Sequence, residues 1–184
     1  MRIIAGDFKG TKLITPKTDD IRPTGDKIKG AIFNMIAPYI YNAIIIDLFA
    51  GTGNLGLEAL SRGANKVYFV EKSKISLDIL KENIRKLGVE NQSVVMNRTS
   101  SKALDDIKEC ADIIFLDPPY NQGFIKKSID EILQKNVLAD EGLIVAEHSK
   151  NEELKELPLE LHLFKEKIYG DIAVSIYIKN QERI

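Results

Sequence analysis

The chain has 184 residues, of which 44% are hydrophobic and 29% are charged, so it suits one globular domain with room for a small appendage. No apolar run approaches the ~20 residues that a membrane span needs, and the N-terminus lacks a signal-peptide pattern. A single cysteine, Cys110, excludes an internal disulfide, and with only two histidines it also argues against a structural metal. We therefore expect a cytoplasmic protein without a metal site.

The first 40 residues differ in pattern and charge from the rest. Residues 1–30 carry seven basic and four acidic groups, a charge of +3, which leaves −4 for the remainder of the net −1. Residues 2–15 read as strand, tight turn and strand, and residues 24–37 as a helix capped by Thr24. The excess charge indicates either an ordinary solvated surface or a basic face for a polyanion. We expect an N-terminal extension over 1–40 and one domain over 41–184.

From residue 44 onward, short apolar strands alternate with helical patterns. Strands are predicted at 44–49, 66–71, 93–97, 111–117 and 142–149, and helices at 54–64, 74–87, 100–110 and 124–138. This order predicts an α/β fold with a mostly parallel, Rossmann-like sheet covered on both faces. The tail holds two further strands around Gly170 and Asp171, which predict an antiparallel hairpin that completes a seven-stranded sheet.

The sequence DLFAGTGNLG at 47–56 follows the first of these strands and contains a G-x-G-x-x-G pattern. Such a loop binds a dinucleotide or S-adenosylmethionine, or it is only a tight turn from strand to helix. The carboxylate of Asp47 disfavours a pyrophosphate and favours the cationic S-adenosylmethionine. Glu71, twenty residues after Gly51 and at the end of the next strand, suits the ribose hydroxyls.

The sequence DPPY at 117–120 ends the fourth strand. Two prolines fix the backbone there, which indicates either a simple strand-ending turn or a rigid holder for reacting groups. The Asp117 carboxylate and the Pro118 carbonyl can accept the N–H groups of a planar amine and stabilise the charge that develops as it attacks a methyl group. Tyr120 offers a face on which an unstacked base can lie.

Together these motifs resemble the S-adenosylmethionine-dependent amino methyltransferases. The ordered run of MRIIAGDFKGTKL, IRPTGDKIKGAIFN, IIDLFAGTGNLGLEALSRGA, VYFVEK and FLDPPY is similar to the RsmD-type family, which methylates the exocyclic N2 of one guanine in small-subunit ribosomal RNA. The resemblance implies the class I methyltransferase fold and S-adenosylmethionine as cofactor. Its implied partner is ribosomal RNA. Because a protein of this size with a short basic N-terminal segment offers little surface for reading sequence, we expect an assembled or assembling small subunit as the substrate. We expect a monomer by default.

The resemblance also implies roles for individual residues. It assigns the target base to Asp117, Pro118 and Tyr120. The implied cofactor contacts are Asp47, Ala50, Gly51, Gly53 and Glu71, with Thr99 or Ser100 as candidates for the adenine ring. Arg22 and Thr24 match the family's RPT element, and Lys27 and Lys29 follow it. With Arg2 and Lys9 from the basic N-terminal segment, they are the RNA-binding candidates. The chain has DKIKG where the family usually has DRVRE, so two lysines replace arginines and lose the planar fork for phosphate.

Three other functions share parts of this pattern. A DNA adenine methyltransferase has the same DPPY chemistry, although the chain has no room for a separate target-recognition domain. A protein glutamine methyltransferase would leave the basic N-terminal segment unexplained. A non-enzymatic nucleotide-binding module would account for the glycines but not for DPPY.

Overall fold

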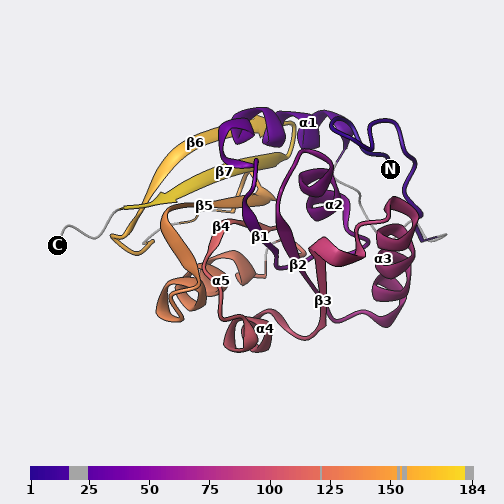
Figure 1. Cartoon of the computed structure of the whole chain (residues 1–184). Coiled ribbons are helices and arrows are strands. Elements are labelled where there is room, and N and C mark those ends of the chain that lie inside the picture. The colour runs from indigo at the N-terminus through magenta and orange to yellow at the C-terminus, as the bar shows by residue number, and fades with distance from the viewer. Residues whose placement is uncertain (17–24, 121, 153, 155–156, 181–184) are drawn as a thin grey trace.

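Seven strands form one sheet in the part of the chain that the computed structural model describes, which is residues 1–16, 25–120, 122–152, 154 and 157–180. The strands are β1 (Ile44–Asp47), β2 (Lys66–Glu71), β3 (Ser93–Asn97), β4 (Ala111–Leu116), β5 (Leu138–Ser149), β6 (Leu161–Tyr169) and β7 (Ile172–Lys179). They lie in the order β3-β2-β1-β4-β5-β7-β6 (Figure 1). The first five are parallel to one another, and β7 is antiparallel to both β5 and β6, so the predicted mixed sheet is confirmed.

The sheet reverses its direction of growth between β1 and β4, and this determines where a ligand can bind. Asp47 at the end of β1 pairs with Phe69 on one side and with Phe115 on the other. The chain leaves β1 and β4 on opposite faces of the sheet, which opens a crevice beyond their carboxyl ends. The motifs at 47–56 and 117–120 both begin at this crevice.

In the described residues, five α-helices cover the two faces of the sheet: α1 (Asp26–Met35), α2 (Asn54–Ser61), α3 (Lys74–Leu87), α4 (Ser100–Asp106) and α5 (Phe124–Gln134). Figure 1 shows α1 and α2 above the sheet and α4 and α5 below it. Because strand side chains alternate between faces, Ile45 belongs to the core with the first three helices and Ile46 to the core with α4 and α5. Two separate hydrophobic cores therefore hold the sheet rigid.

Some of the predicted ends of helices and strands agree with the structure, and others do not. Helix α3 has the predicted bounds, 74–87. The Ser73 hydroxyl before it accepts the Ser76 N–H, and Gly88 after it has a left-handed φ of 68°. Helix α1 begins at Asp26, with Gly25 in the cap position and no side-chain cap. The predicted cap, Thr24, lies outside the described residues. Strand β5 begins at Leu138 rather than at 142, because an irregularity near Glu141, whose φ is 60°, lets the strand continue past the bend.

The N-terminal segment packs on the sheet through the same core as α1 to α3. Its predicted hairpin is reduced to one antiparallel bridge, between Arg2 and Lys12. The side chains of Ile3 and Leu13 are buried in the core, and the backbone between them turns back on itself through the hydrogen bond from Gly10 N to Ile3 O at 2.9 Å. Burial of these two side chains, together with hydrogen bonds such as that from Ile3 N to Thr11 O at 2.9 Å, holds the segment in place.

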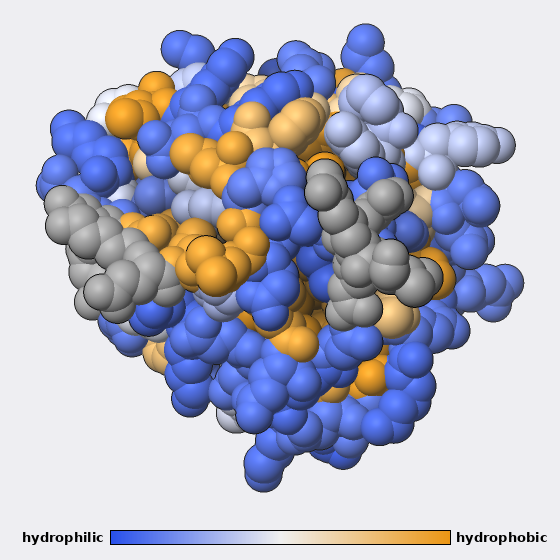
Figure 2. All heavy atoms as spheres, turned by 90° about the vertical axis from the view of Figure 1, so that its left-hand side faces the viewer, coloured by the Kyte–Doolittle hydropathy of each residue, from blue (hydrophilic) through white to orange (hydrophobic). Residues whose placement is uncertain are grey.

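The β6–β7 hairpin forms one edge of the sheet, and Gly170 makes its turn with φ of 63°, as predicted. Strand β6 is exposed over most of its length, and Figure 2 shows hydrophobic side chains among polar ones on this side of the molecule. The exposed hydrophobic residues of β6 are Leu163, Phe164 and Ile168, with the Lys165 ammonium 4.8 Å from the Phe164 ring centre. Among the helices of the described residues, none is long and apolar enough to cross a bilayer.

Candidate active site

A cavity of about 710 Å³ opens at the carboxyl ends of β1, β2 and β4. This volume lies in the range of small-molecule and cofactor sites. The predicted residues that line it are Ala50, Gly51, Glu71, Thr99, Ser100, Asp117, Pro118 and Tyr120. The two motifs, almost seventy residues apart in the chain, thus form two walls of the same cavity.

The glycine loop lies tightly against the helices and strands behind it. Gly53 has a φ of 92°, and a Cβ placed on it would be 2.6 Å from a methyl group of Leu80. A Cβ on Gly56 would be 2.3 Å from the ring of Phe69. Neither position accepts a side chain without displacing the core, so these glycines allow α2 to start close to the sheet. Neither glycine lines the cavity, and the contact of Gly53 with the cofactor stays a prediction.

Asp47 also lies beneath the loop rather than on the cavity wall. Its side chain is 2% exposed, and its Oδ2 accepts the Gly56 N–H at 3.0 Å. Burial, reinforced by the nearby carboxylate of Glu71 and opposed by the Gly56 N–H, raises the pKa of Asp47 to about 7. In the structure the Asp47 carboxylate thus supports the first turn of α2, and its contact with a cofactor cation stays a prediction.

Glu71 is held on the cavity wall by three backbone amides. Its Oε2 accepts the Gly51 N–H at 2.9 Å, and its Oε1 accepts the N–H groups of Lys72 at 2.8 Å and Ser73 at 2.7 Å. A carboxylate accepts about four hydrogen bonds, so this arrangement fixes the acid and leaves capacity for a ligand hydroxyl. The spacing of twenty residues between Gly51 and Glu71 corresponds to a direct contact.

The DPPY wall is positioned by β4 and β5. Pro118 is buried and Asp117 partly exposed, and the end of β4 is tied to β1 by the hydrogen bond from Leu48 N to Phe115 O at 3.1 Å. The Tyr120 hydroxyl donates to Oε1 of Glu147 on β5 at 2.7 Å. Glu147 is 3% exposed and was not predicted as a site residue. Its position in the apolar run of β5 could have indicated it, because an acid that is buried there needs a hydrogen-bond donor nearby.

Lys29 was predicted to bind RNA, and the structure contradicts this. Its side chain is fully buried, and its Nζ lies 3.3 Å from Oε2 of Glu58 and donates to Arg2 O at 2.6 Å and to Asn54 Oδ1 at 2.8 Å. Burial lowers the pKa of Lys29, and the Glu58 carboxylate opposes that shift. Its ammonium is enclosed by the protein and cannot reach a phosphate.

Glu58 and Asn83 tie the N-terminal segment to the site. Glu58 accepts the N–H groups of Ile4 at 2.7 Å and Ala5 at 3.0 Å, and it pairs with Arg62 at 2.8 Å. The Asn83 amide donates to the carbonyl of Thr52 in the glycine loop at 3.0 Å and to that of Ile14 at 3.1 Å. Both side chains are fully buried, so the segment is bonded to the elements that form the cavity.

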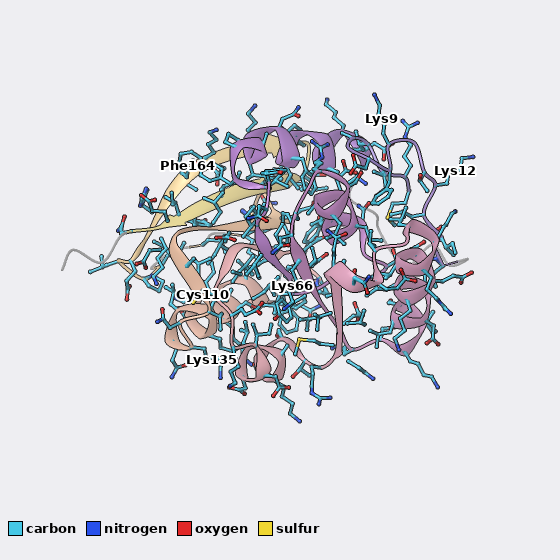
Figure 3. The ribbon with its side chains drawn as sticks, viewed as in Figure 1. Lys9, Lys12, Lys66, Cys110, Lys135 and Phe164 are labelled. Carbon is cyan, nitrogen blue, oxygen red and sulfur yellow. The ribbon has the colours of Figure 1, made fainter. Side chains whose placement is uncertain are left out.

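The other basic candidates differ in position. Lys9 and Lys27 are exposed, and Figure 3 shows Lys9 and Lys12 extending outward from the N-terminal segment. Arg2 is exposed and pairs with Asp26 at 2.8 Å. The remaining two candidates, Arg22 and Thr24, lie outside the described residues.

The residues with metal-binding chemistry are dispersed. Within the described ranges, no group of three His, Cys, Asp or Glu side chains could hold an ion. His148 is buried, with Nε2 2.8 Å from the Ser175 hydroxyl, and it belongs to β5 rather than to the cavity wall. The cysteine, Cys110, is exposed just before the amino end of β4, whereas the cavity lies beyond the carboxyl end of that strand.

The sheet order, the antiparallel hairpin and the cavity beyond β1 and β4 define a Rossmann-like class I methyltransferase fold. Residues 1–178 match the family model described as "Conserved hypothetical protein 95". The chain belongs to this family, and it is also similar over nearly its whole length to proteins named ribosomal RNA small subunit methyltransferase D.

Two relatives and one solved structure show how far the similarity extends. The chain is 38% identical to ribosomal RNA small subunit methyltransferase D of Haemophilus influenzae over 183 residues, which cover 96% of this chain and 93% of the relative. It is 36% identical to the Escherichia coli K12 protein of the same name, over 96% of this chain and 89% of the relative. The structure of the Escherichia coli protein yhhF, described as a candidate methyltransferase, superposes with a TM-score of 0.88 at 32% identity and covers 98% of both chains.

Proposed function

We propose that this protein transfers a methyl group from S-adenosylmethionine to the exocyclic N2 amine of a guanine in small-subunit ribosomal RNA. The relatives' names support methylation of small-subunit ribosomal RNA. The observation that carries the chemistry is that Glu71 and Asp117 line one cavity, from two strands on either side of the switch point. A methyl donor and an amine must meet in such a cavity for direct transfer.

The residues of the cavity fit S-adenosylmethionine by their chemistry. Glu71 holds an acceptor toward the ribose hydroxyls, and the three backbone amides that donate to it keep the side chain in place. Ala50, Gly51 and Thr99 line the same wall, with Leu48 and Val70 as apolar neighbours for a flat ring. When bound, S-adenosylmethionine supplies an electrophilic methyl group on a sulfonium. Asp47 and Gly53 support the loop from beneath.

The target side is formed by Asp117, Pro118 and Tyr120. The Asp117 carboxylate and the Pro118 carbonyl accept the two N–H groups of the guanine amine, which draws its lone pair out of conjugation and stabilises the positive charge that develops on nitrogen. Tyr120 stacks on the base, and its hydrogen bond to Glu147 fixes the plane of the ring. After transfer, the proton leaves the amine for Asp117 or water.

The RNA meets the exposed face of the N-terminal extension, residues 1–40, beside the catalytic domain, residues 41–184. Lys9, Lys27 and Arg2 are exposed there, and we include Arg22 and Thr24 from the sequence. We propose that the enzyme works in the cytoplasm as a monomer. A small protein with few basic contacts reads little sequence by itself, so we infer that an assembled or assembling small subunit supplies much of the specificity.

The proposal is tested by methyl transfer from labelled S-adenosylmethionine into small ribosomal subunits from cells that lack this protein, with DNA and ribosomal proteins in parallel. We expect label only in the RNA, recovered as N2-methylguanosine. Label in DNA or protein would support methyl transfer to an amine but contradict RNA as the substrate.

The role of Asp117 is tested with Asp117→Ala. We expect turnover to fall by at least about 10²-fold, while the affinity for S-adenosylmethionine stays within about twofold. Asp130→Ala, an exposed acid on the outer side of α5, serves as the matched control and should be unchanged. Loss of cofactor affinity in Asp117→Ala would move Asp117 from the target side to the cofactor side.

A further inference from the structure

Asn54, the first residue of α2, lies on the cavity wall and is oriented by a buried cation. Its Oδ1 accepts a hydrogen bond from the Lys29 Nζ at 2.8 Å. An ammonium has only hydrogens to donate, so the amide oxygen must face Lys29 and the amide nitrogen, Nδ2, must face the other way. Lys29 is itself fixed by Glu58 and by Arg2 O. The direction of the Asn54 amide is therefore set by the fold.

The Nδ2 atom of Asn54 is shielded from solvent, and it has no hydrogen-bond partner among the described residues. A buried donor left without an acceptor costs free energy, so such an atom marks a place for an acceptor that a ligand brings. Its neighbours on the wall include Thr52 and Met1, and the Thr52 hydroxyl lies 4.0 Å from the Met1 sulfur. The hydroxyl thus has a weak partner of its own.

The charge around Asn54 favours an anion. Lys29 lies behind the amide in a cluster with Glu58 and Arg62, which together carry one net positive charge, and the positive end of the α2 dipole lies beside it. The acids of the cavity, Glu71 and Asp117, come from the ends of β2 and β4 instead. A donor in a positive environment cannot hold an ammonium and is suited to a carboxylate.

We propose that Asn54 Nδ2 donates a hydrogen bond to the carboxylate at the amino-acid end of S-adenosylmethionine, and that Lys29 is the positioning residue that aims it. This inference rests on the proposed function and adds a binding residue to the same cavity. It also gives Lys29 a role on the cofactor side of the protein in place of RNA binding.

The test compares two ligands that differ only in this carboxylate, S-adenosylmethionine and decarboxylated S-adenosylmethionine, by isothermal titration calorimetry with the full chain. Asn54→Ala should weaken S-adenosylmethionine about tenfold and the decarboxylated ligand by less than about twofold. Asn54→Asp keeps an acceptor for Lys29 but brings a negative charge to the carboxylate, so it should weaken S-adenosylmethionine further than Asn54→Ala. Asn91→Ala, an exposed asparagine before β3, is the control and should bind both ligands as the wild type does.

Lys29→Arg separates positioning from folding, because arginine keeps the charge and several donors but presents them in a different geometry. It should fold as the wild type does and show a smaller preference for S-adenosylmethionine over the decarboxylated ligand. Equal losses for both ligands in Asn54→Ala, or no loss for either, would overturn the role of Asn54. Tighter binding of S-adenosylmethionine by Asn54→Asp would place the ammonium there and also overturn it. Failure of the wild type to bind either ligand would overturn the proposed function and this inference with it.

Discussion

The outer and inner sides of helix α1 carry lysines in opposite environments. Lys27 is exposed, whereas Lys29, two residues further on, is fully buried and bonded to Glu58, Asn54 and Arg2 O. Both lysines belong to the same basic stretch of sequence, and both were predicted to bind RNA. The first can meet a polyanion, and the second connects the N-terminal segment to the helix that begins at the cavity. Basic residues in a helix therefore indicate a polyanion site only when they lie on the exposed side of that helix.

The same contrast holds for the acids under the glycine loop. Glu58 has Lys29 and Arg62 as cationic partners, at 3.3 Å and 2.8 Å. Asp47 has the Gly56 N–H as its hydrogen-bond donor, together with the nearby negative charge of Glu71. One buried acid is thus compensated by cations and the other is pushed toward its neutral form.

Replacing each of the two lysines by methionine, in Lys29→Met and Lys27→Met, should give the largest difference in stability. Loss of Lys29 leaves Glu58 buried with one cation fewer and Asn54 Oδ1 without its donor, so we expect a loss of about 3–5 kcal/mol in the free energy of unfolding. Lys27→Met should stay within about 0.5 kcal/mol of the wild type. Urea denaturation measures both, and equal effects in the two variants would contradict the difference in burial.

The next largest effect concerns Asp47, whose raised pKa makes stability depend on pH. The folded state keeps a proton that the unfolded state loses between the ordinary value of 3.8 and about 7, so stability falls as pH rises through that window and levels off above it. The difference between these two pKa values corresponds to a change of at most about 4 kcal/mol in the free energy of unfolding.

Asp47→Asn removes this titration while keeping an oxygen for the Gly56 N–H. The free energy of unfolding of Asp47→Asn, relative to that of the wild type, should therefore rise between pH 4 and pH 8 by up to about 4 kcal/mol. Unfolding by urea at several pH values measures it, with Asp130→Asn as the exposed control. A constant difference across this range would mean that the Asp47 carboxyl titrates alike in the folded and unfolded protein.

The smallest effect concerns RNA affinity. Lys27→Met should weaken binding to small-subunit ribosomal RNA by a few-fold and reduce the slope of log K against log salt by about 0.7–0.9, the value for one phosphate contact. Lys29→Met, measured where it is folded, should leave that slope unchanged. Filter binding over a range of salt concentrations compares the two, and a reduced slope in Lys29→Met would restore Lys29 to the RNA side.

Much of the site followed from local sequence because the carboxyl ends of neighbouring parallel strands meet at one edge of a sheet. That rule, applied to the glycine loop, Glu71 and DPPY, brought together residues that do line one cavity. The rule says which strand end a residue occupies but not which way its side chain points. Asp47 and Gly53 therefore lie at the predicted end of β1, but they pack behind the residues that line the cavity.

The burial of Lys29 had a signal that charge counting overlooked. Lys29 lies three, four and seven residues before Ile32, Phe33 and Ile36, which are all fully buried, so it occupies the apolar face of α1 at helical spacing. Glu58 likewise lies in a helix whose residues from Leu55 to Ser61 are all buried. A charge on an apolar face predicts a buried partner, although it does not say which residue that partner is.

By itself, the sequence determined the alternation of strands and helices, the hairpin at Gly170 and the two motifs at the strand ends, because these depend on hydrophobic period, turn chemistry and neighbouring residues. Only the tertiary structure decided the contacts of Glu147 with Tyr120, of Glu58 with Lys29 and the N-terminal segment, and of Lys29 with Asn54. Each of these joins residues more than twenty positions apart. Their partners are chosen by how helices and strands pack, and no local pattern in the chain contains that information.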